Sequence, residues 1–164
     1  MYEHIVVPLD GSKLAEEALP DAERLARLTS APVHLVRVID LSDLMWHGQS
    51  GWVMEDTAAE HALAAESTAA SSYLETIAER LVGAGLVAET EVRRGQPSRE
   101  VIAAARPGDL IVMAPHGRSG VTRWFLGSVA EEVVRRAEVP VLLVRANKLE
   151  MSQNEPTPAL ANRS

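Results

Sequence analysis

A chain of 164 residues fits a single domain of ordinary size, which can fold without a disulfide or a metal. It contains no cysteine, which excludes disulfides, thiolate chemistry and cysteine metal sites. The formal net charge is −7 with acidic and basic residues interspersed, whereas a nucleic-acid-binding surface is normally basic. No apolar run is long enough to span a membrane, and the first residues lack the regions of a signal peptide. We therefore expect a cytoplasmic protein that binds neither nucleic acid nor membrane.

Two apolar runs in the first quarter of the chain predict buried parallel strands. Residues 4–9 (HIVVPL) lead into Asp10, Gly11 and Ser12, which predict a turn, and residues 32–39 (PVHLVRVI) form the second run. Between the two runs, apolar residues recur every three or four positions, which predicts a helix capped by Ser12. Pro20 lies inside this helical pattern and should kink the helix or remove one of its hydrogen bonds.

The central part of the chain predicts a long loop followed by a long helix. Residues 41–56 contain two glycines, two tryptophans and two methionines without a clear period. Their apolar side chains could pack on the domain, cover a ligand or meet a second subunit, and the sequence does not separate these alternatives. Residues 57–84 are rich in alanine and glutamate, which predicts a helix ended by glycine. Its apolar stripe consists of Leu63, Ala70, Leu74, Ile77 and Leu81.

The second half of the chain continues the alternation of strands and helices. Residues 87–92, 110–113 and 139–144 predict strands, and the first of these alternates apolar with charged residues, as a strand near a sheet edge would. Residues 99–105 and 127–137 predict helices, and the polar tail 146–164 predicts disorder. Five strands alternating with four helices predict a single doubly wound α/β domain, whose parallel sheet is covered by helices on both faces. Ligands of such folds bind outside the carboxyl ends of the strands, where the strand order reverses.

Two segments that directly follow predicted strands contain residues suited to a ligand site. Asp10 either closes an Asx-type turn with the amides of Gly11 and Ser12 or contacts a ligand. Residues 114–120 (APHGRSG) follow the most apolar strand. Their glycines either serve a tight turn or let the backbone approach a ligand closely.

A third segment, Gly127 and Ser128, opens the helix that comes next. The unpaired amides and the positive dipole end of a helix N-terminus attract phosphate. Ser128 and Glu131 also match S-x-x-E, a capping box that needs no ligand, so both interpretations remain open. Gly117, nine further residues and then Gly127-Ser128 match the ending of the motif G-x2-G-x9-G-[ST].

The order and spacing of these pieces resemble the nucleotide-binding branch of the universal stress protein family. The resemblance covers residues 1–145 and includes VPLDGS, VRVID, GQP, MAPHGRSG, LGSVAEEV and VPVLLVR. It implies a five-stranded parallel sheet of order 3-2-1-4-5, with an adenine nucleotide (ATP or AMP, with or without Mg²⁺) between the ends of strands one and four. It further implies a homodimer through the last strand, from Val139 to Val144, with either Val141 and Leu143 or Leu142 and Val144 buried at the contact.

The same resemblance assigns nucleotide contacts to particular residues. The end of strand one would flank the adenine and ribose, and one residue of strand two would touch the base. The segment after strand four would line the ribose and phosphates, and the start of the last helix would hold phosphates through backbone amides and a serine hydroxyl. These residues are Pro8, Leu9, Asp10, Val38, Met113, Ala114, Gly117, Arg118, Gly127, Ser128, Val129 and Ala130.

The sequence departs from the family motif at its first glycine, which is Ala114 here. Pro115 favours extended backbone at residue 114, which alanine adopts without strain, so we expect nucleotide binding to persist. The chain has no G-x4-G-K-[ST] motif, and we expect a stress-response regulatory protein rather than an enzyme, with no catalytic or metal-binding residue assigned. Two alternatives stay open. One is a family member that binds no nucleotide and acts through protein–protein contacts, and the other is a weak ATP hydrolase assisted by His116 and Arg118.

Overall fold

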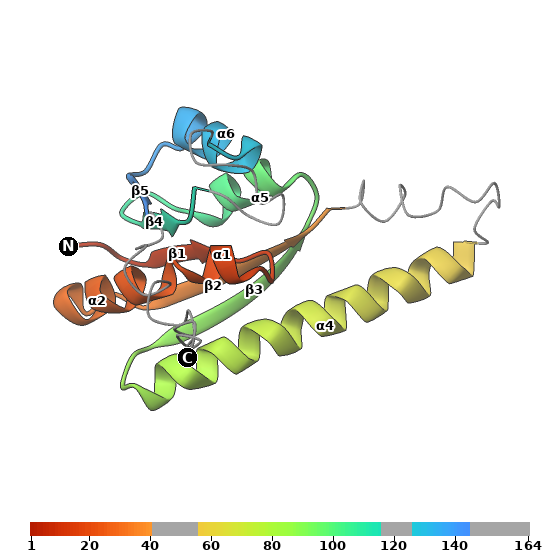
Figure 1. Cartoon of the computed structure of the whole chain (residues 1–164), viewed down its shortest axis with the longest axis horizontal. Helices are drawn as coiled ribbons and strands as arrows, with labels where there is room; N and C mark the ends of the chain where they lie inside the picture. Colours follow the sequence, from red (N-terminus) through yellow and green to blue (C-terminus); the bar gives the residue numbers. More distant parts are fainter. Residues whose placement is uncertain (41–55, 116–125, 145–164) are drawn as a thin grey trace, which may run out of the picture.

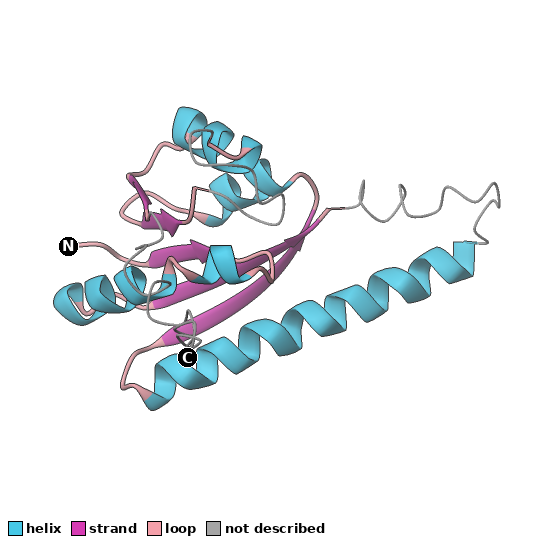
Figure 2. Cartoon of the chain, in the orientation of Figure 1, coloured by secondary structure: helices cyan, strands magenta, loops and turns pink. Residues whose placement is uncertain are grey.

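The computed structural model describes residues 1–40, 56–115 and 126–144, which form a five-stranded parallel sheet between helices (Figure 1 and Figure 2). The strand order is β3-β2-β1-β4-β5, so the predicted order and the α/β class are confirmed. The strands are β1 (Ile5–Pro8), β2 (Val33–Ile39), β3 (Ala88–Arg94), β4 (Leu110–Met113) and β5 (Val141–Leu143). Apart from residue 56, the predicted loop 41–56 lies outside the described residues, as does the predicted tail 146–164.

β1 lies at the centre of the sheet because it pairs with a strand on each side. Ile5 is level with Val33 of β2 and with Leu110 of β4. The chain crosses the sheet in one direction from β1 to β3, and β4 then returns to the opposite side of β1. The strand order therefore reverses between β1 and β4, and their carboxyl ends form the edge where this fold class binds ligands.

Two hydrophobic clusters, one on each face, hold the helices against the sheet. The helices that cover the faces are α2 (Leu19–Thr29), α4 (Asp56–Gly83), α5 (Pro97–Ala104) and α6 (Ser128–Arg136). On one face, α2 and α4 pack on the sheet and bury Leu74 and Leu81 of α4. On the other face, α5 and α6 bury Val101 and Val133. Figure 1 shows α4 along the lower side of the sheet and α5 with α6 above it. No helix in the described part of the chain could cross a membrane.

The predicted first helix is divided in two, because Pro20 lies at the start of a new helix. α1 is a single turn (Lys13–Glu16), and its N-cap Ser12 accepts a hydrogen bond from the backbone N–H of Ala15 (3.1 Å). α2 begins at Leu19, with Pro20 in its first turn, where a missing N–H removes no helical hydrogen bond. The predicted cap at Ser12 is confirmed, and before Pro20 a two-residue turn, Glu17 and Ala18, separates the two helices.

Several other boundaries differ from the prediction by one or two residues, and proline accounts for the start of two elements. α5 begins at Pro97 rather than at residue 99, since proline is well suited to the first turn of a helix. β5 spans Val141–Leu143 rather than 139–144. Pro140 has no N–H for the strand ladder, although its carbonyl accepts a hydrogen bond from the N–H of Ile111 (3.0 Å). β3 lies at the edge of the sheet, as its alternating pattern predicted.

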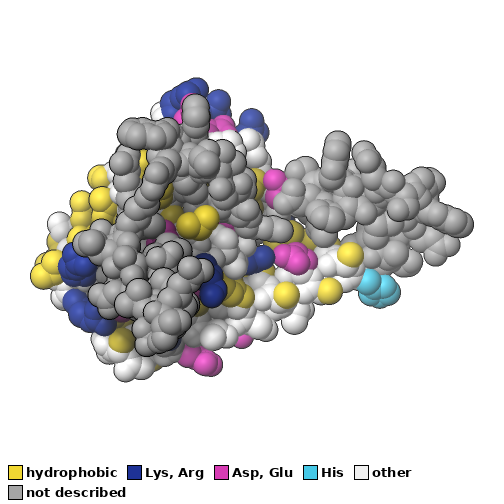
Figure 3. Space-filling view, in the orientation of Figure 1, with side chains coloured by type: hydrophobic (Ala, Val, Ile, Leu, Met, Phe, Trp, Pro, Cys, Tyr) yellow, Lys and Arg dark blue, Asp and Glu magenta, His cyan; other side chains and the backbone are white. Residues whose placement is uncertain are grey.

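α6 carries acidic residues near its start and basic residues in its last turn, and they pair with one another. Glu132 and Arg136 form an ion pair (3.2 Å), and Glu131 pairs with Arg135 in the same way. Figure 3 shows basic side chains over α6 at the top of the view, with acidic ones beside them. Exposed pairs of this kind contribute little to stability, but they prevent α6 from presenting a surface of one sign.

Acidification should destabilise the protein through His34 of β2. Burial lowers the pKa of this imidazole below its ordinary value of 6.5, against the opposing effect of Glu91, whose carboxylate lies 3.2 Å away. The unfolded chain therefore binds the proton at a higher pH than the folded chain. The free energy of unfolding should fall as the pH drops below about 6.5.

The comparison of wild type with His34→Gln isolates this effect from the titration of carboxylates. Urea unfolding at about pH 7.5 and about pH 5.5 gives the loss of stability for each protein, and the loss should be smaller in His34→Gln. An equal loss in both proteins would show that His34 does not contribute to the pH dependence.

Candidate functional site

The turn after β1 is closed by its own side chains. The backbone N–H of Ser12 donates to Oδ1 of Asp10 (2.9 Å), which is the Asx-type turn that the sequence offered as one interpretation. The backbone N–H of Leu9 donates to the carbonyl of Val36 (2.8 Å), so β2 fixes the chain directly before the turn. Gly11 has a φ of +84°, a left-handed conformation that favours glycine. The sequence therefore sets the geometry of this turn locally, and a ligand contact by Asp10 stays a prediction.

The end of β4 lies directly beside the start of α6. The backbone N–H of Gly127 donates to the carbonyl of Pro115 (2.9 Å), which closes the connection between the two elements. Gly127 is the N-cap of α6, and as a glycine it offers the helix no capping side chain of its own. The capping-box interpretation of Ser128 and Glu131 is therefore wrong, because Ser128 already lies in the helix, one position beyond the cap. The N-cap residue consequently satisfies none of the first-turn amides of α6 with a side chain.

The described site residues lie at one edge of the sheet. They occupy the carboxyl ends of β1, β2 and β4 and the first turn of α6, whereas Gly117 and Arg118 lie outside the described residues. Leu9 and Ala130 bury their side chains in the two hydrophobic clusters, so they could offer a ligand only their backbone. Val38 packs partly against the cluster beneath α5 and α6 and remains partly exposed.

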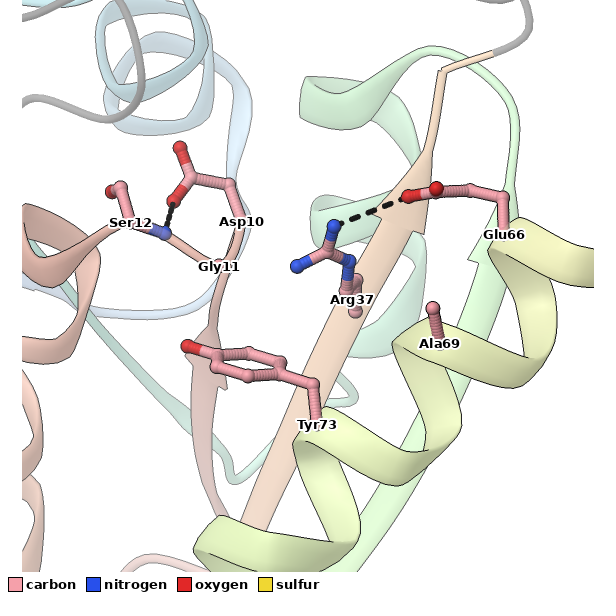
Figure 4. Close-up of a pocket in the computed structure, with 7 residues that line it drawn as sticks. All are labelled: Asp10, Gly11, Ser12, Arg37, Glu66, Ala69 and Tyr73. Atoms are coloured by element: carbon pink, nitrogen blue, oxygen red, sulfur yellow. Dashed lines mark hydrogen bonds and ion pairs between the residues drawn. The ribbon is translucent and has the colours of Figure 1, made fainter.

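A cavity of about 400 Å³ lies beside the β1 turn, on the side that faces α4 (Figure 4). Arg37 of β2 reaches into it, and its Nη2 donates to Oε1 of Glu66 on α4 (3.2 Å). The guanidinium carbon of Arg37 lies 5.4 Å from the centre of the Tyr73 ring, within the range of a cation–π contact. The cavity is lined by Asp10, Gly11, Ser12, Arg37, Glu66, Ala69 and Tyr73.

Tyr73 links α4 to α1 across the floor of this cavity. Its hydroxyl donates to Oε1 of Glu16 (3.0 Å). Burial raises the pKa of Tyr73 above its ordinary value, and the hydrogen bond to Glu16 raises it further. The hydroxyl therefore stays protonated and keeps donating at neutral pH. Within the described ranges, no three His, Asp or Glu side chains form a group that could hold a metal ion.

The sequence did not predict that Arg37, Glu66 and Tyr73 would lie together. One signal was present, because Arg37 interrupts the apolar run of β2, and a charge in a strand covered on both faces needs a nearby partner. Glu66 lies 29 positions further along the chain. Several other acidic residues of the same helix could have served equally well in a sequence pattern.

Comparison with known proteins agrees with the fold and its motifs. The sequence model described as "Universal stress protein family" matches residues 1–145. Universal stress protein MJ0531 of Methanocaldococcus jannaschii is 34% identical over 153 residues, which cover 92% of this chain and 86% of that protein. The solved structure of MJ0577 from the same organism has a TM-score of 0.77 and 27% identity, and the match covers 90% of this chain and 98% of that one.

A further solved structure, a universal stress protein in complex with cAMP, shares the fold with a TM-score of 0.60 and 22% identity. That match covers 89% of this chain and 98% of the other. The family sequence model spans the whole sheet and all the helices described above. The chain belongs to the universal stress protein family.

Proposed function

We propose that this protein binds an adenine nucleotide, ATP or AMP, at the carboxyl edge of the sheet between β1 and β4. The observation that carries the proposal is the hydrogen bond from Gly127 to the carbonyl of Pro115, which brings the uncapped start of α6 to the end of β4. This is the place where the strand order reverses. Phosphate would bind the amides of α6, and the β1 turn with Asp10 would flank the nucleoside.

Three properties of the edge support a phosphate-bearing ligand. The helix dipole and the first-turn amides of α6 favour negative charge at the start of the helix, beside Gly127 and Ser128. Ser128 is exposed, so its hydroxyl is available to a ligand. Ala114 occupies the position of the first motif glycine, and its methyl group is small enough for the backbone to keep an extended course. The relative in complex with cAMP is 22% identical, so its likeness indicates the fold alone. The proposal therefore rests on the residues of this chain.

We further propose that the protein acts by binding rather than by turnover. Nucleotide occupancy would be the regulatory signal, and Mg²⁺ would accompany ATP through the phosphates. A hydrolase would need a base that positions a water molecule at the γ-phosphate. We assign no described residue to that task.

The thermal stability of the purified protein with and without nucleotide tests this proposal. Ligand at a hundred times its dissociation constant adds about 2.7 kcal/mol to the free energy of unfolding. In a domain of this size, that corresponds to a rise of roughly 5–10 °C in the melting temperature. No shift with ATP, ADP, AMP or cyclic AMP at millimolar concentration would refute nucleotide binding and favour a family member that acts through protein contacts alone.

We also propose a homodimer through β5, and Leu142→Lys should disrupt it. β5 is an edge strand, and its Leu142 is 39% exposed, whereas Val141 and Leu143 pack partly against the cluster under α6. An uncovered apolar edge strand is a ready pairing surface. Sedimentation at micromolar concentration should give about twice the 17.7 kDa of one chain for wild type and the single mass for Leu142→Lys.

The matched control is Leu28→Lys, which alters an exposed leucine of α2, a helix that packs mainly on β1 and β2. This variant should remain dimeric. A monomeric wild type, or a Leu142→Lys variant that keeps the double mass, would rule out β5 as the dimer contact.

A further inference from the structure

The guanidinium of Arg37 is held in one place by α4. The Arg37 side chain is only 15% exposed, and it lies between the β1 turn and α4 (Figure 4). Glu66 binds its Nη2 at 3.2 Å, and the Tyr73 ring lies beneath it. A planar guanidinium with an ion pair at one edge and an aromatic ring at its face has little freedom to reorient.

The same guanidinium lies directly against the β1 turn. A Cβ atom built on Gly11 would come within 2.3 Å of Nη1 of Arg37 and within 3.3 Å of its Cζ. Glycine is favoured at this position by its φ of +84°, and a side chain there would have to push the guanidinium of Arg37 aside. In its present position, the guanidinium therefore supports the turn on the side that faces α4.

The turn that Arg37 supports is the one that carries Asp10. Oδ1 of Asp10 accepts the N–H of Ser12 at 2.9 Å, so the carboxylate and the turn backbone move as one unit. On one side, the turn lines the cavity that also contains Arg37. The turn directly follows β1, at the edge of the sheet where the strand order reverses. A displaced guanidinium would give the turn room to shift away from that edge.

We propose that Arg37 is a positioning residue, which sets nucleotide affinity by supporting the Asp10–Gly11–Ser12 turn from the α4 side. The inference rests on the proposed nucleotide site and adds a residue from outside it. Arg37 need not touch the ligand, because its effect passes through the turn. Its partner Glu66 is 39% exposed, so water can solvate this carboxylate when the arginine is removed. Replacement of Arg37 should therefore weaken nucleotide binding without leaving an isolated buried charge.

Arg37→Leu, Arg37→Lys and the control Arg80→Leu test this role. Arg80 of α4 forms an ion pair with Glu23 of α2 at 3.2 Å, and its side chain is 57% exposed. Isothermal titration with ATP should show binding weakened roughly 2- to 30-fold in Arg37→Leu, the range for a coupled contact outside a site, and unchanged binding in Arg80→Leu. Arg37→Lys should recover part of the affinity, because lysine keeps the charge but lacks the planar fork.

Hydrogen exchange in the nucleotide-free protein measures the turn itself. The Ser12 amide, bonded to Asp10, should exchange faster in Arg37→Leu than in wild type and at the wild-type rate in Arg80→Leu. This measurement needs no ligand. If wild type binds no nucleotide, the proposed function fails. Faster exchange of the Ser12 amide in Arg37→Leu would then still show that Arg37 stabilises the turn.

Gly11→Ala, alone and combined with Arg37→Leu, tests whether the two residues act through one contact. A methyl group at Gly11 must displace the guanidinium in the wild-type background, but it meets no guanidinium in Arg37→Leu. The loss of ATP affinity caused by Gly11→Ala should therefore be smaller in the double variant. Additive losses would overturn the proposal. So would a Ser12 exchange rate in Arg37→Leu that equals the rate in Arg80→Leu.

Discussion

Gly127→Asp is expected to abolish the stabilisation by ATP while leaving the unliganded protein as stable as wild type or slightly more so. Gly127 is the N-cap of α6, with φ −60° and ψ 148°, a conformation that aspartate adopts without strain. Aspartate is a favoured N-cap residue, and its carboxylate would accept the amides that the wild-type helix leaves without a capping side chain. The same carboxylate would occupy the place of the phosphate and repel it.

Without ligand, Gly127→Asp should thus melt at the wild-type temperature or slightly above it. Addition of ATP should not produce the rise of roughly 5–10 °C that is expected for wild type. Ser128→Ala is the matched control, since it changes the neighbouring residue without adding a charge. Ser128 lies one position beyond the N-cap, so its replacement removes no N-cap side chain and should leave the unliganded melting temperature unchanged. Most of the ATP-induced rise should survive. A full ATP-induced rise in Gly127→Asp would exclude the start of α6 as the phosphate site.

Leu74→Ala is expected to lower the free energy of unfolding by about 2–5 kcal/mol, the cost of removing a buried leucine side chain from a packed core. Leu74 of α4 has no exposed surface and belongs to the cluster that joins α4 and α2 to the sheet. The melting temperature should fall by at least ~4 °C. Urea unfolding measures the change directly.

Leu28→Ala provides the control for this prediction, because it makes the same substitution at a helical leucine that is 74% exposed. Its free energy of unfolding should stay within about 0.5 kcal/mol of wild type. Equal free energies of unfolding for Leu74→Ala and Leu28→Ala would mean that α4 does not pack on the sheet through Leu74.

The fold could be predicted from the sequence because its strands and helices differ in local pattern. The run at 110–113 is apolar at every position, as a strand buried on both faces must be, and it forms β4. The stripe on α4 predicted burial of Leu63, Ala70, Leu74, Ile77 and Leu81; the last four are buried, whereas Leu63 stays partly exposed. The strand order 3-2-1-4-5 came from the family resemblance alone, because alternating elements do not specify which strands become neighbours.

The site could be predicted only in part, because its residues meet through long-range packing. Gly127 and Ser128 were recognisable by their spacing, but the capping box failed because the helix starts one residue earlier than S-x-x-E requires. Tyr73 and Glu16 are 57 positions apart, and nothing in either local pattern indicates their hydrogen bond. The role of Gly11 beside Arg37 likewise depends on the pairing of β1 with β2.

Native mass spectrometry of the wild-type protein with ATP tests the central claim most directly, because it reports the mass of whatever the chain holds. The account predicts one nucleotide for each 17.7 kDa chain, and Gly127→Asp under the same conditions should show the mass of the bare protein. A wild-type protein that remains bare with ATP, ADP, AMP and cyclic AMP at millimolar concentration would contradict the account.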